Sequence, residues 1–174
     1  EFKIVGSYRR GALESGDIDI IVMDPQNDVN VFHKYLDLLI EKGIIIEVLS
    51  KGDVKSLCIS KIRGKPARRI DFMFTPKKEY AFAELYFTGN KNFNTVMRAK
   101  ALTLGYSMNE HGLYKMENGV KTTKLSKYFP TEKDVFKFLG LVYKSPKERT
   151  GANAIEHTER TMQKLESIIL SAEQ

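Results

Sequence analysis

Residues 15–23 read Ser-Gly-Asp-Ile-Asp-Ile-Ile-Val-Met, and this stretch decides the fold more than any other part of the chain. Ile18 and the run 20–23 form a nearly continuous apolar strand, the pattern of a strand covered on both faces. Asp17 and Asp19 are two residues apart, so in a strand their side chains point to one face, about 7 Å apart at the Cα level. Carboxylates so placed can hold two cations about 3.5 to 4 Å apart, as phosphoryl-transfer sites require.

A third carboxylate comes from a second apolar strand, where Asp71 lies between Ile70 and Phe72. An Asp-x-Asp spacing is also common in surface turns, and what strengthens the metal interpretation is the burial of its strand, because unpaired buried carboxylates are costly. Asp71 has an alternative of its own. Since Arg68 and Arg69 precede it, an Asp–Arg ion pair at a strand end explains Asp71 equally well when it is considered alone.

The segment upstream of the Asp-x-Asp strand has the composition of an anion-binding turn. A short apolar strand over 2–5 ends at Gly6-Ser7, and Tyr8-Arg9-Arg10-Gly11 follows. Backbone N–H groups, a hydroxyl and a guanidinium can converge there on an anion. A Gly-Ser turn by itself is weak support, so this interpretation depends on the nearby carboxylates.

Hydrophobic spacing and turn residues predict regular elements along the rest of the chain. Asn30 is the expected N-cap of the first amphipathic helix, and Asn118-Gly119 favours the type I′ turn of a hairpin. The strand-rich first half and helix-rich second half predict an α+β fold in two subdomains. The expected strands are 2–5, 17–23, 44–49, 54–62, 68–74, 112–116 and 120–125. The expected helices are 30–42, 77–85, 91–104, a short one that starts at the capping-box residues 131–134, and 154–172.

The composition narrows the class of protein. Apolar residues make up 42% of the 174 positions, which is ample for a core. Lys and Arg total 28 against 22 Asp and Glu, and the formal charge of +6 would help to attract nucleic acid, although a solvated basic surface explains it as well. Cys58 is the one cysteine, which excludes an internal disulfide and a Cys-based zinc site and favours a reducing compartment, nuclear or cytoplasmic. No apolar run is long enough to span a membrane.

Taken together, the strings 6–11, 15–19 and 68–71 resemble the family X DNA polymerases, the family related to DNA polymerases beta and lambda. The resemblance covers residues 4–149. It implies a nucleotidyltransferase palm with a mixed β-sheet and helices, followed by a small helical subdomain with a β-hairpin. The implied domains are a palm over 1–84, a C-terminal fingers or thumb-type subdomain over 85–149, and a linker and helix over 150–174.

The resemblance also implies a role for individual residues. In the family the three aspartates bind two divalent ions, and the one matching Asp71 faces the primer 3′ hydroxyl. The implied catalytic and metal residues are Asp17, Asp19 and Asp71. The residues implied at the triphosphate are Ser7, Arg10, Ser15 and Gly16, and those at the sugar and base are Tyr86, Phe87, Thr88, Gly89 and Asn94. The DNA contacts expected are Arg69 and Arg98, with Lys55 and Lys61 as candidates that a solvated hairpin edge explains equally well.

The activity that the resemblance implies is DNA-directed DNA synthesis, with deoxynucleotides added to a primer 3′ end by two-metal phosphoryl transfer and short gap filling in DNA repair. The cofactor would be two Mg²⁺ ions, for which Mn²⁺ can substitute. The partners would be primer–template or gapped DNA and a dNTP, without a membrane, and the chain is expected to be monomeric. The alternatives are a template-independent nucleotidyltransferase, which the segment 86–89 disfavours, and a non-catalytic DNA-binding module.

The two ends of the chain depart from the family pattern. The N-terminal lyase module of family members is absent from residues 1–174, so we expect no deoxyribose-phosphate lyase activity from this stretch. The helix expected over 154–172, read as joined to Glu1, resembles the helix that precedes the Gly-Ser motif in family members. This suggests a circular permutation, and the alternative is a plain C-terminal helix that packs wherever its apolar face finds cover.

Overall fold

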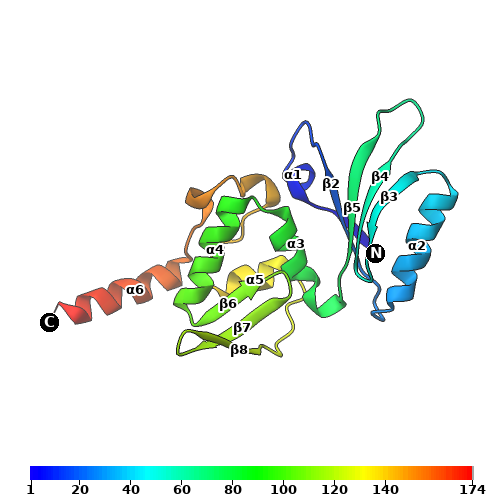
Figure 1. Cartoon of the computed structure of the whole chain (residues 1–174). Coiled ribbons are helices and arrows are strands. Elements are labelled where there is room, and N and C mark those ends of the chain that lie inside the picture. The colour runs from blue at the N-terminus through cyan, green and yellow to red at the C-terminus, as the bar shows by residue number, and fades with distance from the viewer. Residues whose placement is uncertain (174) are drawn as a thin grey trace.

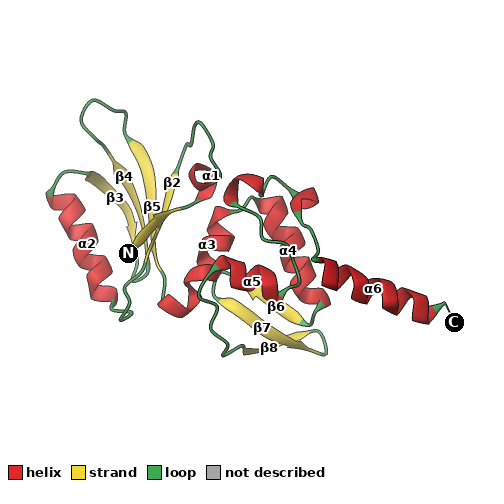
Figure 2. Ribbon diagram, turned by 180° about the vertical axis from the view of Figure 1, so that it is seen from behind, coloured by secondary structure: helices red, strands yellow, loops and turns green. Residues whose placement is uncertain are grey.

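A five-stranded mixed sheet forms the N-terminal part of the molecule, as the computed structural model of the chain, which describes residues 1–173, shows in Figures 1 and 2. Its order is β1-β2-β5-β4-β3. The central strands β2 and β5 are parallel, and the other neighbours are antiparallel. The strands are β1 (Phe2–Ile4), β2 (Ile18–Val22), β3 (Ile45–Lys51), β4 (Lys55–Ser60) and β5 (Arg68–Phe74).

Helix α2 (Val29–Glu41) covers one face of this sheet, as Figure 1 shows. Its apolar stripe buries Phe32 and Leu36 completely, each worth about 1.5 to 3 kcal/mol of hydrophobic stabilisation. The helix begins after Asp28, whose side chain accepts a hydrogen bond from the Asn30 N–H, so the N-cap predicted at Asn30 is wrong by two residues. The Asp28 carboxylate satisfies an N–H of the first turn, so the helix starts before Asn30.

The opposite face of the sheet is covered only in part, by α3 (Tyr80–Thr88), which follows a short 3-10 turn. Tyr80 and Ala83 of α3 pack with Ile21 and Met73 in one apolar cluster. Phe82 and other residues of α3 belong to a second cluster, the core of the C-terminal part. Helix α3 therefore contributes to both cores, and the domain boundary expected at residue 84 falls inside it.

The C-terminal part packs helices on a small antiparallel sheet of order β6-β7-β8. Its helices are α4 (Lys91–Thr103) and α5 (Glu132–Phe138), and its strands are β6 (Tyr106–Asn109), β7 (Gly112–Glu117) and β8 (Val120–Lys124). The turn between β7 and β8 has positive φ at both Asn118 and Gly119, as the predicted type I′ hairpin requires. The sequence predicted this hairpin and missed β6, whose four residues are too few for a clear alternation.

Three further expectations need correction. Residues predicted as a loop after β1 form a short helix, α1 (Gly6–Arg9). The helix predicted over 77–85 ends only at Thr88, so the segment expected at the sugar is helical. The last helix, α6 (Glu159–Ala172), starts five residues later than predicted, because Val142 and Leu141 hold residues 156 and 157 extended and Thr158 then caps the first turn.

Helix α6 extends away from the rest of the molecule, on the side opposite the five-stranded sheet (Figure 1). None of its residues is buried, and its apolar side chains Met162, Leu165, Ile168 and Ile169 are all more than 40% exposed. A permuted palm helix would have to lie against the palm sheet, and in this structure α6 does not. No helix among residues 1–173 is long and apolar enough to cross a bilayer.

Candidate active site

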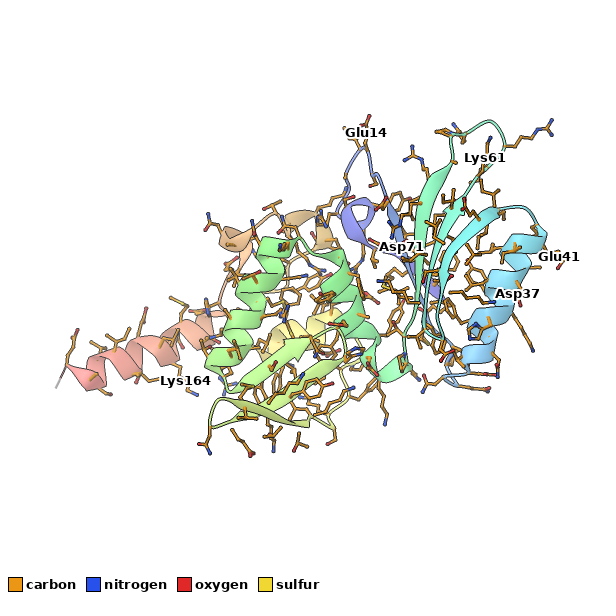
Figure 3. All side chains as sticks on the ribbon, viewed as in Figure 1. Glu14, Asp37, Glu41, Lys61, Asp71 and Lys164 are labelled. Carbon is orange, nitrogen blue, oxygen red and sulfur yellow. The ribbon has the colours of Figure 1, made fainter. Side chains whose placement is uncertain are left out.

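Two of the three predicted carboxylates lie side by side in the centre of the sheet. Asp19 of β2 and Asp71 of β5 are direct partners in the parallel register, and neighbouring strands are about 4.8 Å apart. Alternation places Ile18 and Ile20 on the side of α2, so both aspartates point to the face that α3 covers in part. Figure 3 shows Asp71 at the space between the sheet and the C-terminal part. Both carboxylates are half-buried.

The third carboxylate does not occupy the expected position. Asp17 was predicted inside the strand, but β2 starts at Ile18, and Asp17 lies in an exposed bend before it. The reason is that pairing between β2 and β5 begins only at Ile18 with Ile70. The loop before Ile18 is held by Arg68, whose Nη1 donates to the Ser15 carbonyl at 2.8 Å. Asp17 is therefore next to the pair without sharing its strand geometry.

Like charges dominate the electrostatics of this pair. Burial raises the pKa of the Asp19 carboxyl above its usual value, and the neighbouring carboxylates of Asp71 and Asp17 raise it further. Lys55 and Arg69 act in the opposite direction on the same pKa. The Nε of Arg69 lies 3.1 Å from Oδ1 of Asp71, so the ion pair considered as the alternative for Asp71 is present, but it balances only one of the charges.

The predicted phosphate-binding residues gather beside the carboxylates. The hydroxyls of Ser7 in α1 and Ser15 in the following loop lie 2.8 Å apart. Gly6 starts α1 with φ of +70°, and a Cβ at this position would lie 3.3 Å from Oδ2 of Asp19, so glycine suits both the conformation and the space. Arg10, at the end of α1, donates from Nη1 to the Thr88 carbonyl. Three of the predicted residues, Ser7, Ser15 and Arg10, thus belong to or contact the α1 turn, which approaches Asp19 through Gly6.

The segment 86–89 faces this cluster from the end of α3. Arg9 donates to Thr88 Oγ1 at 2.7 Å, and Arg10 to the Thr88 carbonyl, so α1 is fixed to the end of α3. Gly89 ends the helix with φ of +69°, where a Cβ would lie 3.3 Å from Nη1 of Arg10. The structure therefore brings the predicted phosphate and sugar segments together.

The two residues predicted on α4 share a small site. The Asn94 Nδ2 donates to the Tyr86 carbonyl at 2.7 Å, and Arg98 lies one turn further along the helix. Tyr86, Asn94 and Arg98 line one cavity of about 10 Å³, room for a single water molecule. Tyr86 and Arg98 are exposed beside it, and Phe87 instead packs partly into the core.

The remaining predicted DNA contacts separate into two groups. Lys55 pairs with Met73 in the sheet, two residues from Asp71, and so lies on the carboxylate face. Lys61 lies in the loop between β4 and β5, far from Asp71, as Figure 3 shows. The structure brings Lys55 and Arg69 to the site and leaves Lys61 outside it.

A buried ionic cluster next to the site was missed by sequence reasoning. It consists of Arg9, Glu84, Glu132 and Arg149, which come from α1, α3, α5 and the segment after α5. The Arg9 guanidinium binds both oxygens of the Glu132 carboxylate, and Arg149 Nη1 lies 2.7 Å from Glu132 Oε2. Arg149 is completely buried. Single charged residues scattered through 140 positions carry no spacing signal, so only the fold could show this cluster.

The donor chemistry of the carboxylate pair fits a divalent cation. Oxygen-only ligands are those that Mg²⁺ prefers, and Asp19 and Asp71 offer carboxylates on neighbouring strands with Asp17 close by in sequence. Among residues 1–173 the structure gathers no three His, Cys, Asp or Glu side chains closely enough to form a complete metal site. Asp19 and Asp71 are therefore the residues that would hold an ion first.

Comparisons with known proteins give the same family for both parts of the chain. The DNA polymerase beta palm family matches residues 1–77, and the DNA polymerase beta thumb family matches residues 83–150. DNA polymerase lambda of Rattus norvegicus is 37% identical over 158 residues, and that of Arabidopsis thaliana is 32% identical over 166. Each alignment covers 83% of this chain but only 28% and 31% of the respective relative, so the chain spans less than a third of their length.

These matches agree with the geometry described above. The mixed sheet that carries the carboxylate pair lies within the palm match, and α4, the small sheet and α5 lie within the thumb match. The α+β fold and the resemblance expected from the sequence are confirmed. The chain belongs to the family X DNA polymerases, and it contains their palm and thumb regions.

Proposed function

We propose that this chain carries out template-directed DNA synthesis, adding deoxynucleotides to a primer 3′ end by two-metal phosphoryl transfer, as in short gap filling during DNA repair. The observation that supports it best is the Asp19–Asp71 pair, whose two members are direct partners in the parallel register. The Ser7–Ser15 hydroxyl pair and Arg10 belong to the neighbouring turn. Two adjacent carboxylates, of which Arg69 balances only one charge, suit a metal–triphosphate substrate when hydroxyl and guanidinium donors lie next to them. A protein that only bound DNA would not need the carboxylates.

In this proposal the carboxylates hold the metal ions. Asp19 and Asp71, with Asp17 from the adjoining bend, would bind two Mg²⁺ ions, and Mn²⁺ could replace them. The ions would supply charge neutralisation for the transferring phosphoryl group. Asp71, whose partner Arg69 already restrains one oxygen, would face the primer 3′ hydroxyl and favour its deprotonation.

The α1 turn would bind the triphosphate of the dNTP. Ser7 and Ser15 present hydroxyls at 2.8 Å from each other, and Gly16 adds a backbone N–H without a side chain in the way. Arg10 can offer a charge-assisted donor to a phosphate oxygen. Ser7 and Arg10 belong to the segment fixed on Thr88, and the Ser15 hydroxyl is hydrogen-bonded to Ser7, so these three groups are positioned before substrate binds.

The end of α3 and one face of α4 would contact the sugar, the base and the template. The backbone of 86–89 is the predicted sugar contact. Asn94 and Arg98 lie on one face of α4 and are predicted to contact the minor groove at the incoming base and the template strand. We further propose that the chain acts as a monomer in a nuclear or cytoplasmic compartment, on primer–template or gapped DNA.

Primer extension on a gapped, templated DNA with Mg²⁺ tests this function. The variant is Asp71→Asn, which keeps the shape and removes the charge, and its matched control is Asp37→Asn, on the outer side of α2 (Figure 3). We expect templated incorporation by the wild type and the control, and a loss of about a thousandfold or more in Asp71→Asn.

The other outcomes separate the alternatives. Incorporation that ignores the template base would indicate a template-independent transferase. DNA binding without incorporation at any Mg²⁺ or Mn²⁺ concentration would indicate a non-catalytic DNA-binding module. An Asp71→Asn variant that incorporates as fast as Asp37→Asn would overturn the assignment of the site.

A further inference from the structure

A basic groove lies on the far side of the C-terminal part, between α6 and the ends of α4 and α5. Four cations line it, and no carboxylate does. Its volume is about 560 Å³. The cationic residues are Lys100, Lys137, Arg160 and Lys164. None of the four takes part in an ion pair within residues 1–173.

The contacts between α5 and α6 fix the geometry of this groove. The Thr158 N–H donates to the Gly140 carbonyl at 3.0 Å, and the Val142 N–H donates to the Glu156 carbonyl at 2.8 Å. Gly140 has φ of +68°, and a Cβ there would lie 2.4 Å from Thr161 Oγ1, so α6 approaches the end of α5 as closely as glycine allows. The first turn of α6 is therefore a fixed wall of the groove.

A purely local role explains only half of the charge. Lys100 and Lys137 lie in the last turns of α4 and α5, where a cation offsets the negative end of the helix dipole. Arg160 and Lys164 lie on the opposite wall, where Arg160 is in the first turn of α6, a position at which a cation is unfavourable to the helix dipole, and Lys164 is one turn further on. Four like charges thus face one groove without an ion-pair partner among residues 1–173, an arrangement that suits an anionic ligand.

We propose that this groove binds the phosphate backbone of DNA at a distance from the active site. The proposal rests on the proposed function, because a DNA substrate is the polyanion that the chain would meet. Lys100 follows Asn94 by six residues on α4, a rise of about 9 Å, and Figure 3 shows Lys164 on the side of the C-terminal part away from Asp71. Its one aromatic side chain, Phe138, is packed against Tyr106 and Phe129, which leaves no free ring for base stacking. Binding would be independent of sequence.

Anisotropy of a fluorescent duplex of about two helical turns tests the groove, in EDTA and without dNTP so that the result does not depend on catalysis. The variant is Lys137→Gln/Arg160→Gln/Lys164→Gln. The control removes the same charge from exposed lysines elsewhere, Lys34→Gln/Lys42→Gln/Lys115→Gln. We expect the groove variant to bind about tenfold more weakly at 0.1 M salt, with a shallower slope of log affinity against log salt by about 2.7, and the control to change affinity less than twofold.

A charge-conserving variant and a measurement of vesicle binding complete the experiment. Lys137→Arg/Lys164→Arg keeps the charge and should keep the affinity. Equal affinities and slopes in the groove and control variants would overturn the proposal, as would groove-dependent binding to phosphatidylserine vesicles with DNA binding unchanged. Failure of primer extension, with the groove effect intact, would instead count against the proposed function alone.

Discussion

The molecule holds two charge clusters close together that are built on opposite principles. In the Arg9–Glu132–Arg149 cluster, each buried charge has an opposite charge beside it, and the Glu132 side chain is only 5% exposed. In the Asp19–Asp71 pair two like charges are neighbours, Arg69 balances only one of them, and both side chains are half-buried. The charges of the first cluster are paired with one another, whereas the second would gain from a cation. The contrast separates charges that stabilise the fold from charges kept for a ligand.

The two clusters are connected through α1. Arg9 joins the ionic cluster to Thr88, and Arg10, the next residue, reaches the Thr88 carbonyl from the phosphate side. A buried ion pair stabilises weakly compared with apolar packing, but it fixes orientation. In this molecule it fixes the short helix that carries Ser7 and Arg10 against the C-terminal part. The Arg9–Glu132–Arg149 cluster thus positions the residues next to the Asp19–Asp71 pair.

Neutralising one member of the Asp19–Asp71 pair should give the largest effect, a loss of activity without a loss of stability. Asp19→Asn should lower incorporation of dNTP by about 10³- to 10⁴-fold, because a metal ligand is lost, about 4 to 5 kcal/mol in transition-state stabilisation. The same change removes repulsion from Asp71, so the free energy of unfolding in EDTA should stay equal or rise by up to about 1 kcal/mol. Single-turnover incorporation and urea denaturation measure the two quantities. Loss of both activity and stability would mean that Asp19 is structural.

Neutralising one member of the Arg9–Glu132–Arg149 cluster should instead lower the stability of the fold. Glu132→Gln leaves Arg149, which is completely buried, without its counter-ion, and should lower the free energy of unfolding by about 3 kcal/mol. Urea denaturation followed by circular dichroism measures the change. A matched control is Glu166→Gln on the exposed face of α6, expected within about 0.5 kcal/mol of the wild type. If Glu132→Gln is as stable as the control, the cluster adds no stability.

The sequence predicted the Asp19–Asp71 pair better than the Arg9–Glu132–Arg149 cluster, for physical reasons. Asp19 and Asp71 stand inside apolar strands, where a carboxylate is conspicuous, and the parallel register then follows from the fold. The position of Asp17 could not be predicted, because the start of β2 depends on how far β5 pairs and on the Arg68 contact with the Ser15 carbonyl. Glu132 and Arg149 are surface-type residues by composition, and only tertiary packing buries them.

Element boundaries show the same division between local and tertiary causes. The type I′ turn at Asn118-Gly119 and the strand Arg68–Phe74 follow from local chemistry and are where the sequence placed them. The start of α6 was predicted five residues too early, because the extended residues 156 and 157 pair with the chain after α5. The four-residue helix α1 has too few residues for a helical period.

The pH dependence of stability should run in opposite directions for the two clusters. Arg9 and Arg149 hold the pKa of Glu132 below its usual value, so the stability lost in Glu132→Gln should be present above pH 4.5 and shrink as the pH falls through the folded-state pKa. The Asp19 pKa is raised, so the wild type should match Asp19→Asn in acid and fall below it as the pH rises above 3.8. Urea titrations of the three proteins from acid to neutral pH measure both trends. If the stability contributions of Glu132 and Asp19 changed with pH in the same direction, the two clusters would not differ as described.

The smallest effect is expected for an ion pair that belongs to neither cluster. Lys51 Nζ lies 3.8 Å from Asp37 Oδ1, and the two side chains are 48% and 66% exposed. Water and salt screen such a pair, so Lys51→Ala should change the free energy of unfolding by less than about 0.5 kcal/mol. A double-mutant cycle with Asp37→Ala isolates the pairwise part, and the coupling should be indistinguishable from zero at 0.5 M salt. A coupling above about 1 kcal/mol would mean that opposite charge stabilises this fold even without burial, and the loss expected in Glu132→Gln could then no longer be assigned to the burial of Arg149.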